Sequence, residues 1–465
     1  MNKETGVVFE SVDTTLKRLY DEAEKKCLLN IKDFNGRKVL VEGGGYEKIW
    51  LETQPMGGEM YAKRNLDIGL NNQLMFMDHI RDDGRLPGSI KLENGKVIPE
   101  FNKFQGFCFP QPALNMYYLA ELGKEYLEQL YSVLERFDEY LWRVRDSDGD
   151  GCLESWCKYD TGEDHAVRYM DAPDAWSEEY PPEGCRIVPM ASIDVMSYSY
   201  SCRETLEEIS RILGKDELAE GWKSKATQVS GKIADYLWNE EKGTCIDRDK
   251  NHLEIPILYH NTLRAMYWHS IDQHMADAFV NMHLLNPNEF WTRMPLPSVA
   301  VNDSAFRNIS TNNWSGQCEA LTFQRAIRAL ENYGYEKLIP KIGRSLLQAL
   351  ENECIFTQQF DPFTGEISRV SLEGEIDSYG PAILSVLEYI SRIYGVHREK
   401  DQLFWGCTTD TESVYEQKIG EHSYRIENSR VGSRGQIDGK EIFETKADLR
   451  IITDLQGNIT RVVEL

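Results

Sequence analysis

Positive charge is scarce in this sequence, and so are long apolar runs. Lys and Arg number 52 against 76 Asp and Glu, which gives a formal net charge of −24 without any basic stripe. Because nucleic-acid binding needs clustered positive charge, we expect no nucleic-acid partner. No apolar run reaches the roughly 18 residues of a membrane span, and Met1 to Gly6 lack the apolar segment of a secretory signal. We therefore expect no membrane partner either.

Paired cysteines and metal-binding motifs are also missing. The ten cysteines form no CxxC pair and the nine histidines no HExxH spacing, so neither zinc nor a disulfide framework is expected. The cysteines are interpreted as reduced thiols of a cytoplasmic protein. Asp146, Asp148 and Asp150 have the spacing of the first ligands in a calcium-binding loop. The twelfth position of such a loop, which should be glutamate, is Cys157 here. An acidic turn that caps neighbouring helices is the alternative to calcium, and no other cofactor is expected.

Helical periodicity dominates the chain to about residue 396. Leu218, Trp222, Ala226, Val229 and Ile233 recur at spacings of three and four, as on the buried face of a helix. Comparable patterns predict helices at about 11–27, 112–143, 192–213, 257–285, 316–332, 338–349 and 379–394. Longer loops rich in Gly, Pro and aromatic residues lie at 41–61, 84–111, 146–190, 286–315 and 356–378. Helical hairpins joined in this way suggest a ring of paired helices whose loops gather at one end and carry the chemistry.

The pattern changes from helical to alternating after about residue 403. Residues 424–427, 451–454 and 460–463 alternate, and the turn signals at 438–440 and 456–458 divide them. Such segments predict antiparallel strands joined by hairpins. We therefore predict a helical body at residues 8–398 and a small β appendage at 403–465.

The stretch from Asp160 to Arg168 is the most informative part of the chain. It crowds three acids, a histidine and an arginine around Gly162. Acids so close together repel one another, so one of them is expected to keep its proton near neutral pH if it is partly buried. A carboxylic acid that holds its proton is what breaking a glycosidic bond requires. A solvated acidic loop is the alternative interpretation.

Six groups of loop motifs follow one another along the chain. They are Tyr46-Glu47-Lys48-Ile49-Trp50 with Gln54-Pro55, Arg85-Leu86-Pro87 with Phe109-Pro110-Gln111-Pro112, Asp148-Gly149-Asp150-Gly151 with Thr161-Gly162-Glu163-Asp164, Asn313-Trp314-Ser315-Gly316, Phe360-Asp361-Pro362-Phe363-Thr364-Gly365-Glu366, and Tyr379-Gly380-Pro381-Ala382. In this order they resemble the loops of the six-hairpin glycosidases, most nearly the group of trehalases, processing α-glucosidases and mannosylglycerate hydrolases. The resemblance implies an all-α fold, an (α/α)6 toroid with the β appendage behind it. It also implies a glycoside hydrolase that acts on a small intracellular carbohydrate, and it leaves the oligomeric state open.

The resemblance implies roles for individual residues as well. Asp164 matches the general acid of an inverting mechanism, in which a second carboxylate about 6.5–9.5 Å away activates water across the sugar ring. The residues expected at the sugar site are Tyr46, Trp50, Glu52, Gln54, Gln111, Glu163, Arg168, Trp291, Asn313, Trp314 and Gln358. Among them, the charge of Glu163 is expected to raise the pKa of Asp164. Arg168 is expected to lower that pKa or to hold a substrate oxygen.

The resemblance fails at the second carboxylate. Its position holds Gln358, and a neutral amide cannot take a proton from water. Glu375 and Glu373 are the first candidates for the missing base, followed by Glu319. Glu52 and Glu319 stand where the relatives tend to have tryptophan, so the pocket is expected to favour a very polar or positively charged sugar.

Gln358 leaves two other functions open. In an inverting phosphorylase, phosphate itself attacks the anomeric carbon and no base is needed. Arg168, Arg293 or Arg307 would then have to supply part of a cationic pocket. The non-enzymatic alternative is a sugar-binding protein that kept the cleft and lost half of its catalytic pair.

Overall fold

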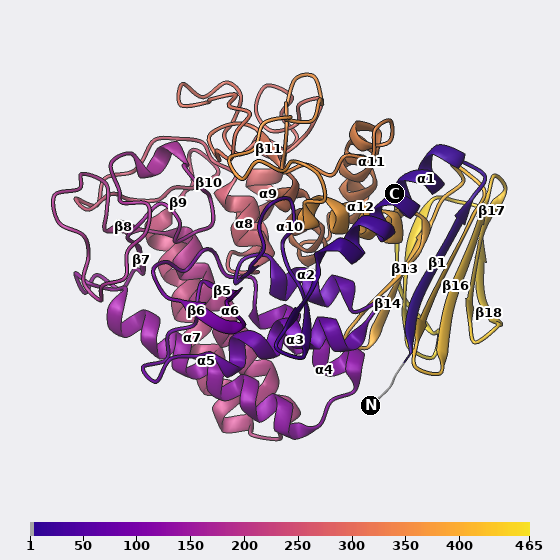
Figure 1. Cartoon of the computed structure of the whole chain (residues 1–465), viewed down its shortest axis with the longest axis horizontal. Coiled ribbons are helices and arrows are strands. Elements are labelled where there is room, and N and C mark those ends of the chain that lie inside the picture. Colours follow the sequence, from indigo (N-terminus) through magenta and orange to yellow (C-terminus); the bar gives the residue numbers. More distant parts are fainter. Residues whose placement is uncertain (1–3) are drawn as a thin grey trace.

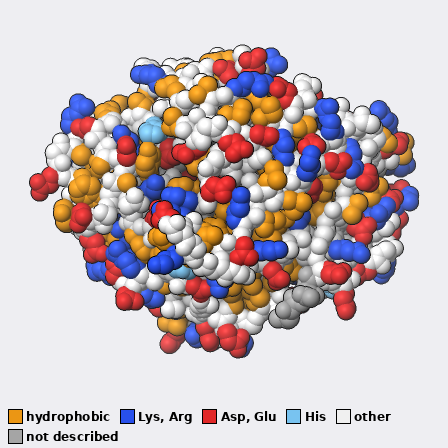
Figure 2. Space-filling model, viewed as in Figure 1, with side chains coloured by type: hydrophobic (Ala, Val, Ile, Leu, Met, Phe, Trp, Pro, Cys, Tyr) orange, Lys and Arg blue, Asp and Glu red, His pale blue; other side chains and the backbone are white. Residues whose placement is uncertain are grey.

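A helical body lies beside a block of β-strands in the computed structural model, which describes residues 4–465 (Figure 1). Acidic and basic side chains are interspersed over the face shown in Figure 2. Within the described residues, no helix has both the length and the apolar character that crossing a membrane requires.

A ring of six helices forms the centre of the body described by residues 4–465. These helices are α2 Gln54–Tyr61, α4 Pro110–Ala120, α6 Ile193–Ile212, α8 Asn261–Tyr267, α10 Ala320–Asn332 and α12 Gly380–Tyr394. Each contacts the next in this order, and α12 returns to contact α2, which closes the ring. Every residue of α2, α8 and α12 is buried. Such burial is expected of helices that have neighbours on all sides.

A second set of helices covers the outside of the ring. These are α1 Thr14–Cys27, α3 Leu66–Asp78, α5 Lys124–Val144, α7 Asp216–Lys232, α9 Gln273–Phe279 and α11 Ile339–Leu350. Each packs against one or two ring helices. In α5, Tyr126, Leu127, Leu130 and Val133 are buried while the residues between them are mostly exposed. This one-sided burial is the source of the helical periodicity in the sequence.

Two helices lie where the sequence pattern predicted none. Helix α2 falls inside the predicted loop 41–61, and α3 follows it. All eight residues of α2 are buried, including Gly57 and Gly58, so it has no polar face to produce a 3.6-residue period. The predicted helix at 112–143 is instead two helices, because Glu121 ends α4 in a left-handed conformation with φ +48°.

Two antiparallel sheets form the β block. The first contains β1 Thr5–Ser11, β15 Ser413–Ile419, β16 His422–Ser429, β17 Gly432–Ile437 and β18 Lys440–Thr445, in that order. The second contains β13 Val396–Glu399, β14 Gln402–Cys407, β19 Leu449–Asp454 and β20 Ile459–Glu464. The rings of Trp405 and Phe443 meet between the sheets with their centroids 5.5 Å apart. The antiparallel strands expected near the C-terminus are therefore present.

Strand β1 joins the two ends of the chain. Thr5 to Ser11 pair with Ile419 to Ser413 along their whole length. Residues 8–11, which were predicted to begin the helical body, thus belong to the β block. Local periodicity cannot reveal this arrangement, because the partner strand lies at the other end of the sequence.

Short strands stiffen the loops around the ring. They are β2 Ile31–Phe34 with β3 Arg37–Leu40, β4 Ile49–Trp50 with β5 Ser89–Glu93 and β6 Lys96–Glu100, β7 Glu154–Ser155 with β8 Met190–Ala191, β9 Trp238–Asn239 with β10 Thr244–Cys245, and β11 Cys318–Glu319 with β12 Gln359–Phe360. Strands β4, β8 and β11 end shortly before α2, α6 and α10 begin. The loop side chains therefore converge where the ring helices have their N-terminal ends.

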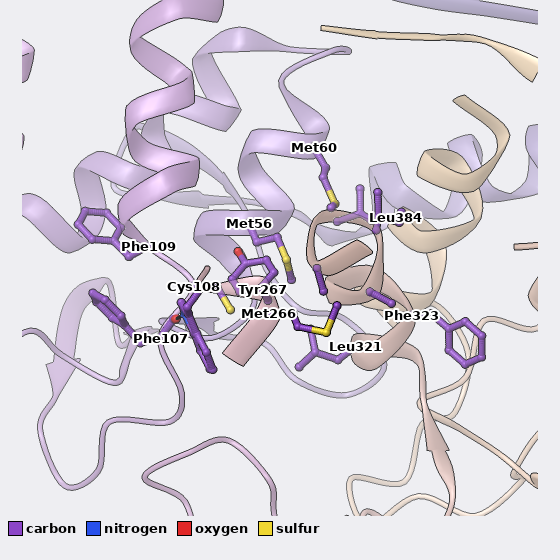
Figure 3. Close-up of a cluster of buried hydrophobic side chains, with 14 of the residues drawn as sticks. Met56, Met60, Phe107, Cys108, Phe109, Met266, Tyr267, Leu321, Phe323 and Leu384 are labelled. Carbon is purple, nitrogen blue, oxygen red and sulfur yellow. Dashed lines mark hydrogen bonds between the residues drawn. The ribbon is translucent and has the colours of Figure 1, made fainter. Parts of the chain in front are cut away.

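Apolar side chains fill the interior of the ring. Figure 3 shows α2, α8, α10 and α12 contributing to one buried cluster with the segment 107–109. Its labelled members are Met56, Met60, Phe107, Cys108, Phe109, Met266, Tyr267, Leu321, Phe323 and Leu384. Burying one such side chain contributes roughly 1.5–3 kcal/mol to stability. The filled interior gives the loops a rigid base, which a precise site requires.

Candidate active site

A pocket of about 440 Å³ lies among the loops at the N-terminal end of the ring helices. The residues that line it come from 42–52, 91–105, 159–165, 312–321 and 358–379. Most are charged, polar or aromatic, as in sites that bind a polar small molecule. The acidic loop at 160–168 therefore opens into a pocket.

Buried Asp160 anchors the acidic loop. It accepts hydrogen bonds from Trp156 N at 2.8 Å and Phe104 N at 3.1 Å, and it pairs with Arg145 at 2.5 Å. Burial alone would raise the pKa of Asp160, but Arg145 and the two N–H donors bring it below its usual value. Further along the loop, Trp314 N donates to the backbone oxygen of Asp164 at 3.0 Å. The loop is thus fixed at two points.

The carboxyl group of Asp164 lies between two amides at the pocket wall. Gln105 Nε2 donates to Oδ1 at 3.2 Å, and Asn312 Nδ2 donates to Oδ2 at 2.9 Å. Burial raises the pKa of Asp164 above its usual value, although the two amides and Lys103 oppose the shift. The shift has the direction that a general acid needs.

Gln358 is connected to Asp164 through a single side chain. Its Nε2 donates to Asn312 Oδ1 at 3.0 Å, and its Oε1 accepts a hydrogen bond from Tyr46 OH at 3.2 Å. Asn312 therefore bridges Gln358 and the acid. The position that the resemblance gives to the base does lie beside the acid, but its amide cannot ionise.

The three candidate bases lie at different depths. Glu373 lines the pocket at its exposed rim. Glu375 lines a small neighbouring cavity together with Gln358. Glu319 is fully buried on β11, where Gln359 Nε2 donates to it at 2.9 Å, and burial raises the pKa of Glu319 well above its usual value. Of the three, Glu373 combines access to the pocket with access to water.

Two further carboxylates line the inner part of the pocket. Glu42 accepts a hydrogen bond from Tyr379 OH at 3.0 Å, and burial, followed by the charge of Glu52, raises the pKa of Glu42 well above its usual value. Glu52 pairs with Arg325, but burial outweighs this pairing and raises the pKa of Glu52 to about 8. Sequence reasoning missed Glu42. The glycine run at 43–45, which directly follows it, was the available signal of a close backbone approach.

Glu163 and Arg168 belong to a buried ion cluster behind the pocket. Arg168 pairs with Glu163, Asp194 and Asp247, and His260 Nε2 lies 2.8 Å from Glu163. Burial would raise the pKa of Glu163, but Arg168 brings it below its usual value. The expected contact between Arg168 and a substrate oxygen is therefore replaced by a structural role, because carboxylates already engage the guanidinium group.

Gln54 and Gln111 have partners outside the pocket. Gln54 Oε1 accepts a hydrogen bond from Trp50 N at 2.7 Å and so shapes the turn before α2. Gln111 Nε2 donates to Thr205 Oγ1 at 3.1 Å in a separate cleft. Both glutamines are thus placed away from the sugar site that the resemblance implied.

In the loop around residue 313, the pocket is lined by Asn312 and not by the expected Asn313. Asn312 lines the pocket with Trp314, whereas Asn313 offers its backbone oxygen to Gln359. Trp291 packs half-buried against the hydrophobic core. The motif located the loop correctly, but it could not tell which side chain turns inward.

Lysines supply the positive charge of the pocket. Lys48, Lys91 and Lys103 line it. Arg293 lines a separate cleft of about 620 Å³, and Arg307 donates to backbone oxygens of its own turn. The arginines considered for a phosphate site are therefore not the cations that face Asp164.

Two of these lysines lie over the ring of Trp50. Nζ of Lys48 and of Lys103 are 5.0 and 5.1 Å from its centroid, so cations already cover the face of the indole ring. Lys48 also pairs with Glu100 at 2.7 Å. Lys103 lies 4.8 Å from the ring centroid of Tyr159, and burial lowers the pKa of Lys103. Within residues 4–465 no acidic side chain forms an ion pair with Lys103.

The central part of the sequence matches a known family. The family described as "Mannosylglycerate hydrolase MGH1-like glycoside hydrolase domain" matches residues 51–379, a span that holds both Asp164 and Gln358. The chain belongs to this glycoside hydrolase family. The group inferred from the loop motifs is thereby confirmed. A curated relative, mannosylglycerate hydrolase from Rubrobacter radiotolerans, is 24% identical over 290 residues, which cover 52% of this chain and 64% of that protein.

Solved structures of two similar proteins share the fold of this family member. A mannosylglycerate hydrolase from Thermus thermophilus, in complex with Tris and D-glycerate, gives a TM-score of 0.61 at 16% identity, over 80% of this chain and 100% of that one. Neutral trehalase from Saccharomyces cerevisiae gives a TM-score of 0.56 at 14% identity, over 79% of this chain and 80% of that one. At these identities the likeness concerns the fold alone.

The calcium-like turn lies apart from the pocket. Side-chain oxygens of Asp146, Asp148 and Asp150 accept hydrogen bonds from backbone N–H groups of the same turn. His252 approaches it, and one ligand atom from each of Asp148, Asp150 and His252 lies within 4.8 Å of the others. These three residues could hold a cation, but the backbone bonds alone account for the aspartates.

Proposed function

We propose that this protein hydrolyses the O-glycosidic bond of a small glycoside with inversion, using Asp164 as the general acid and Glu373 as the base. The observation that carries the proposal is the partly buried carboxyl group of Asp164, which has a raised pKa and opens into the pocket. An acid of this kind holds its proton until a glycosidic oxygen arrives. The closed ring of helices supports the (α/α)6 toroid, with the pocket loops at its mouth.

The reaction needs one proton donor and one proton acceptor. Asp164 gives its proton to the glycosidic oxygen while the bond from that oxygen to the anomeric carbon breaks. Water attacks the same carbon from the opposite face, and Glu373 takes one proton from it. The products are a sugar of inverted configuration and a free alcohol, and solvent returns the proton from Glu373 to Asp164. Tyr46 and Trp314, which line the pocket, are proposed to contact the sugar.

Glu373 is proposed as the base because the deeper carboxylates are less suited to take a proton. Burial raises the pKa of Glu42 and of Glu319 well above the usual value, so both tend to stay protonated. Glu52 is paired with Arg325. Glu373 lies at the pocket rim, where water reaches its carboxylate. This position supports the assignment, because the base of an inverting enzyme must lie where the attacking water also fits.

The substrate we propose carries a carboxylate on its alcohol part. Two of the similar proteins are named mannosylglycerate hydrolases, and one was solved with D-glycerate. In this chain Lys103 places an ammonium group in the same pocket as Asp164, and within residues 4–465 no acidic side chain forms an ion pair with it. A glycerate carboxylate beside Lys103 would provide the missing counter-charge.

Lys103→Met is expected to raise KM for mannosylglycerate by about 10-fold or more, because a hydrogen bond to a charged group is worth about 1.5–3 kcal/mol. KM for methyl mannoside, which has no carboxylate, should stay unchanged. Steady-state kinetics on both compounds measure the difference, with Lys25→Met as a control because Lys25 is exposed. An equal effect of Lys103→Met on both substrates would argue against the carboxylate contact.

The anomeric configuration of the first product tests the reaction itself. Hydrolysis of mannosylglycerate followed by proton NMR should show the inverted anomer before mutarotation, at a rate that inorganic phosphate does not change. Strict dependence on phosphate would instead indicate a phosphorylase, which the amide at Gln358 also permits. Saturable binding without product, across a panel that includes trehalose and neutral mannosides, would indicate a sugar-binding protein. Retention of configuration would contradict the mechanism.

A further inference from the structure

Gln105 is held beside Asp164 in an unusual backbone conformation. Its φ is +59°, in the left-handed region that residues with a side chain rarely adopt. The flanking N–H groups hold it there, since Phe104 N donates to Asp160 Oδ1 at 3.1 Å and Gly106 N donates to Asp160 O at 3.0 Å. The acidic loop itself therefore imposes the conformation. Backbone strain of this kind persists mainly where a functional group must be positioned.

The amide of Gln105 has an acceptor that is not used. Nε2 donates to Asp164 Oδ1 at 3.2 Å, whereas Oε1 is buried and lacks a hydrogen-bond partner within the described part of the chain. Asn312 already serves the other oxygen of Asp164. Buried side-chain oxygens are normally paired. An unpaired one beside a titrating acid points to a second state in which it is used.

The two ends of an amide occupy almost the same space. Rotation of the Gln105 amide by half a turn exchanges Nε2 and Oε1, and so replaces a donor to Asp164 with an acceptor. An ionised carboxylate needs the donor. A carboxylic acid with its proton on Oδ1 needs the acceptor. One side chain can therefore satisfy Asp164 before and after it gives up its proton.

We propose that Gln105 is a positioning residue that serves both protonation states of Asp164, an inference that rests on the function proposed above. While Asp164 is protonated, Oε1 of Gln105 accepts the O–H and keeps the proton on Oδ1. Once the proton has moved to the glycosidic oxygen, Nε2 donates to the carboxylate that remains. No charge is added to the pocket in either state.

Other ionisable groups also act on Asp164. Lys103 and His165 lower its pKa, and the mutual repulsion with the pocket acids acts in the opposite direction. The titratable groups that face Asp164 or share its pocket are Glu42, Tyr46, Glu47, Lys48, Glu52, Lys91, Lys103, Tyr159, His165, Glu319, Glu373 and Tyr379. Replacing Gln105 by an uncharged side chain leaves all of them in place. A change in the titration of Asp164 would then report the lost hydrogen bonds.

The test compares Gln105→Met with Gln73→Met. Methionine keeps the length of glutamine and removes both amide atoms. Gln73 is a matched control on α3: its Oε1 is also buried and unpaired within residues 4–465, but its Nε2 donates to Pro55 O at 2.7 Å. Two readouts are used, the titration of the Asp164 carboxyl carbon by ¹³C NMR and the pH profile of kcat/KM on mannosylglycerate. The Asp164 signal is assigned by its loss in Asp164→Asn.

In Gln105→Met, we expect the Asp164 midpoint and the alkaline limb of kcat/KM to rise by about half to one pH unit, because the donor lost by the charged carboxylate is worth more than the acceptor lost by the neutral acid. kcat should fall several-fold with KM little changed, and Gln73→Met should show neither effect. If Gln105→Met does not fold, Gln105→Leu serves instead, since it is also uncharged and lacks both amide atoms, and its midpoint should also rise.

An unchanged or lowered Asp164 midpoint in the folded variant would overturn the inference. Failure of the inference about Gln105 can be distinguished from failure of the proposed function. If Asp164→Asn is inactive while the Gln105 variants titrate like the wild type, only the role of Gln105 is lost. If Asp164→Asn stays active, the proposed function itself fails.

Discussion

Asp164→Asn is expected to lower kcat by a factor of about 100 to 10,000, the usual contribution of a general acid. The substitution removes the proton that the leaving oxygen needs and changes the shape of the side chain very little. The amides of Gln105 and Asn312 can rotate to pair with the new amide, so the loop should keep its structure. Substrate binding and the free energy of unfolding should therefore stay close to the wild-type values.

Three measurements separate loss of chemistry from loss of structure. Turnover of mannosylglycerate gives kcat, calorimetric titration gives Kd, and urea denaturation gives the free energy of unfolding. Asp171→Asn is the matched control, because Asp171 follows on the same loop and its ion pair with Arg186 lies at the surface. Near-normal turnover in Asp164→Asn would rule out its role as the acid.

Arg168→Met is expected to cost about 3–5 kcal/mol of unfolding free energy, the loss typical of breaking a buried ion pair. Its guanidinium group contacts Glu163, Asp194 and Asp247, whose side chains are at most 2% exposed. Without Arg168 these carboxylates would stay close together away from water, with Arg264 as the remaining arginine in contact with two of them. The cluster would then have to take up protons or open.

Urea denaturation of Arg168→Met and of Arg186→Met measures this difference. Arg186 also pairs with an aspartate, but it is exposed, so its removal should cost at most about 1 kcal/mol. The comparison also decides between two roles of Arg168. If Arg168→Met were as stable as the wild type and mainly raised KM, the arginine would be holding substrate after all, and the buried cluster would not be its main function.

The fold could be predicted from the sequence wherever an element has one buried face and one solvent-exposed face. Helix α5 and strand β16 meet this condition, because apolar and polar residues alternate on them with a fixed period. Helix α2 does not, because all of its residues are buried. Strand β1 was missed for a different reason, since its pairing with β15 depends on residues at the far end of the chain.

The site could be predicted at the level of loops. Motifs located Asp164, Tyr46 and Trp314, which line the pocket together with Glu373, one of the candidates for the missing base. They did not locate Gln105, since an isolated glutamine carries no pattern. They also could not show that Glu163 turns away from the pocket while Asp164, the next residue, turns toward it. The direction of a loop side chain is set by tertiary hydrogen bonds, which a sequence pattern does not contain.

Strand β1 also affects how the chain can fold during its synthesis. Its partner β15 lies roughly 400 residues downstream, so at typical rates of 5–20 residues per second the ribosome needs roughly 20–80 s to supply it. Helix α1 packs against α12, which is synthesised almost as late as β15. Until then the first strand keeps an unpaired edge, which is open to pairing with another nascent chain. Folding intermediates that expose β1 are therefore the species that chaperones would be expected to bind.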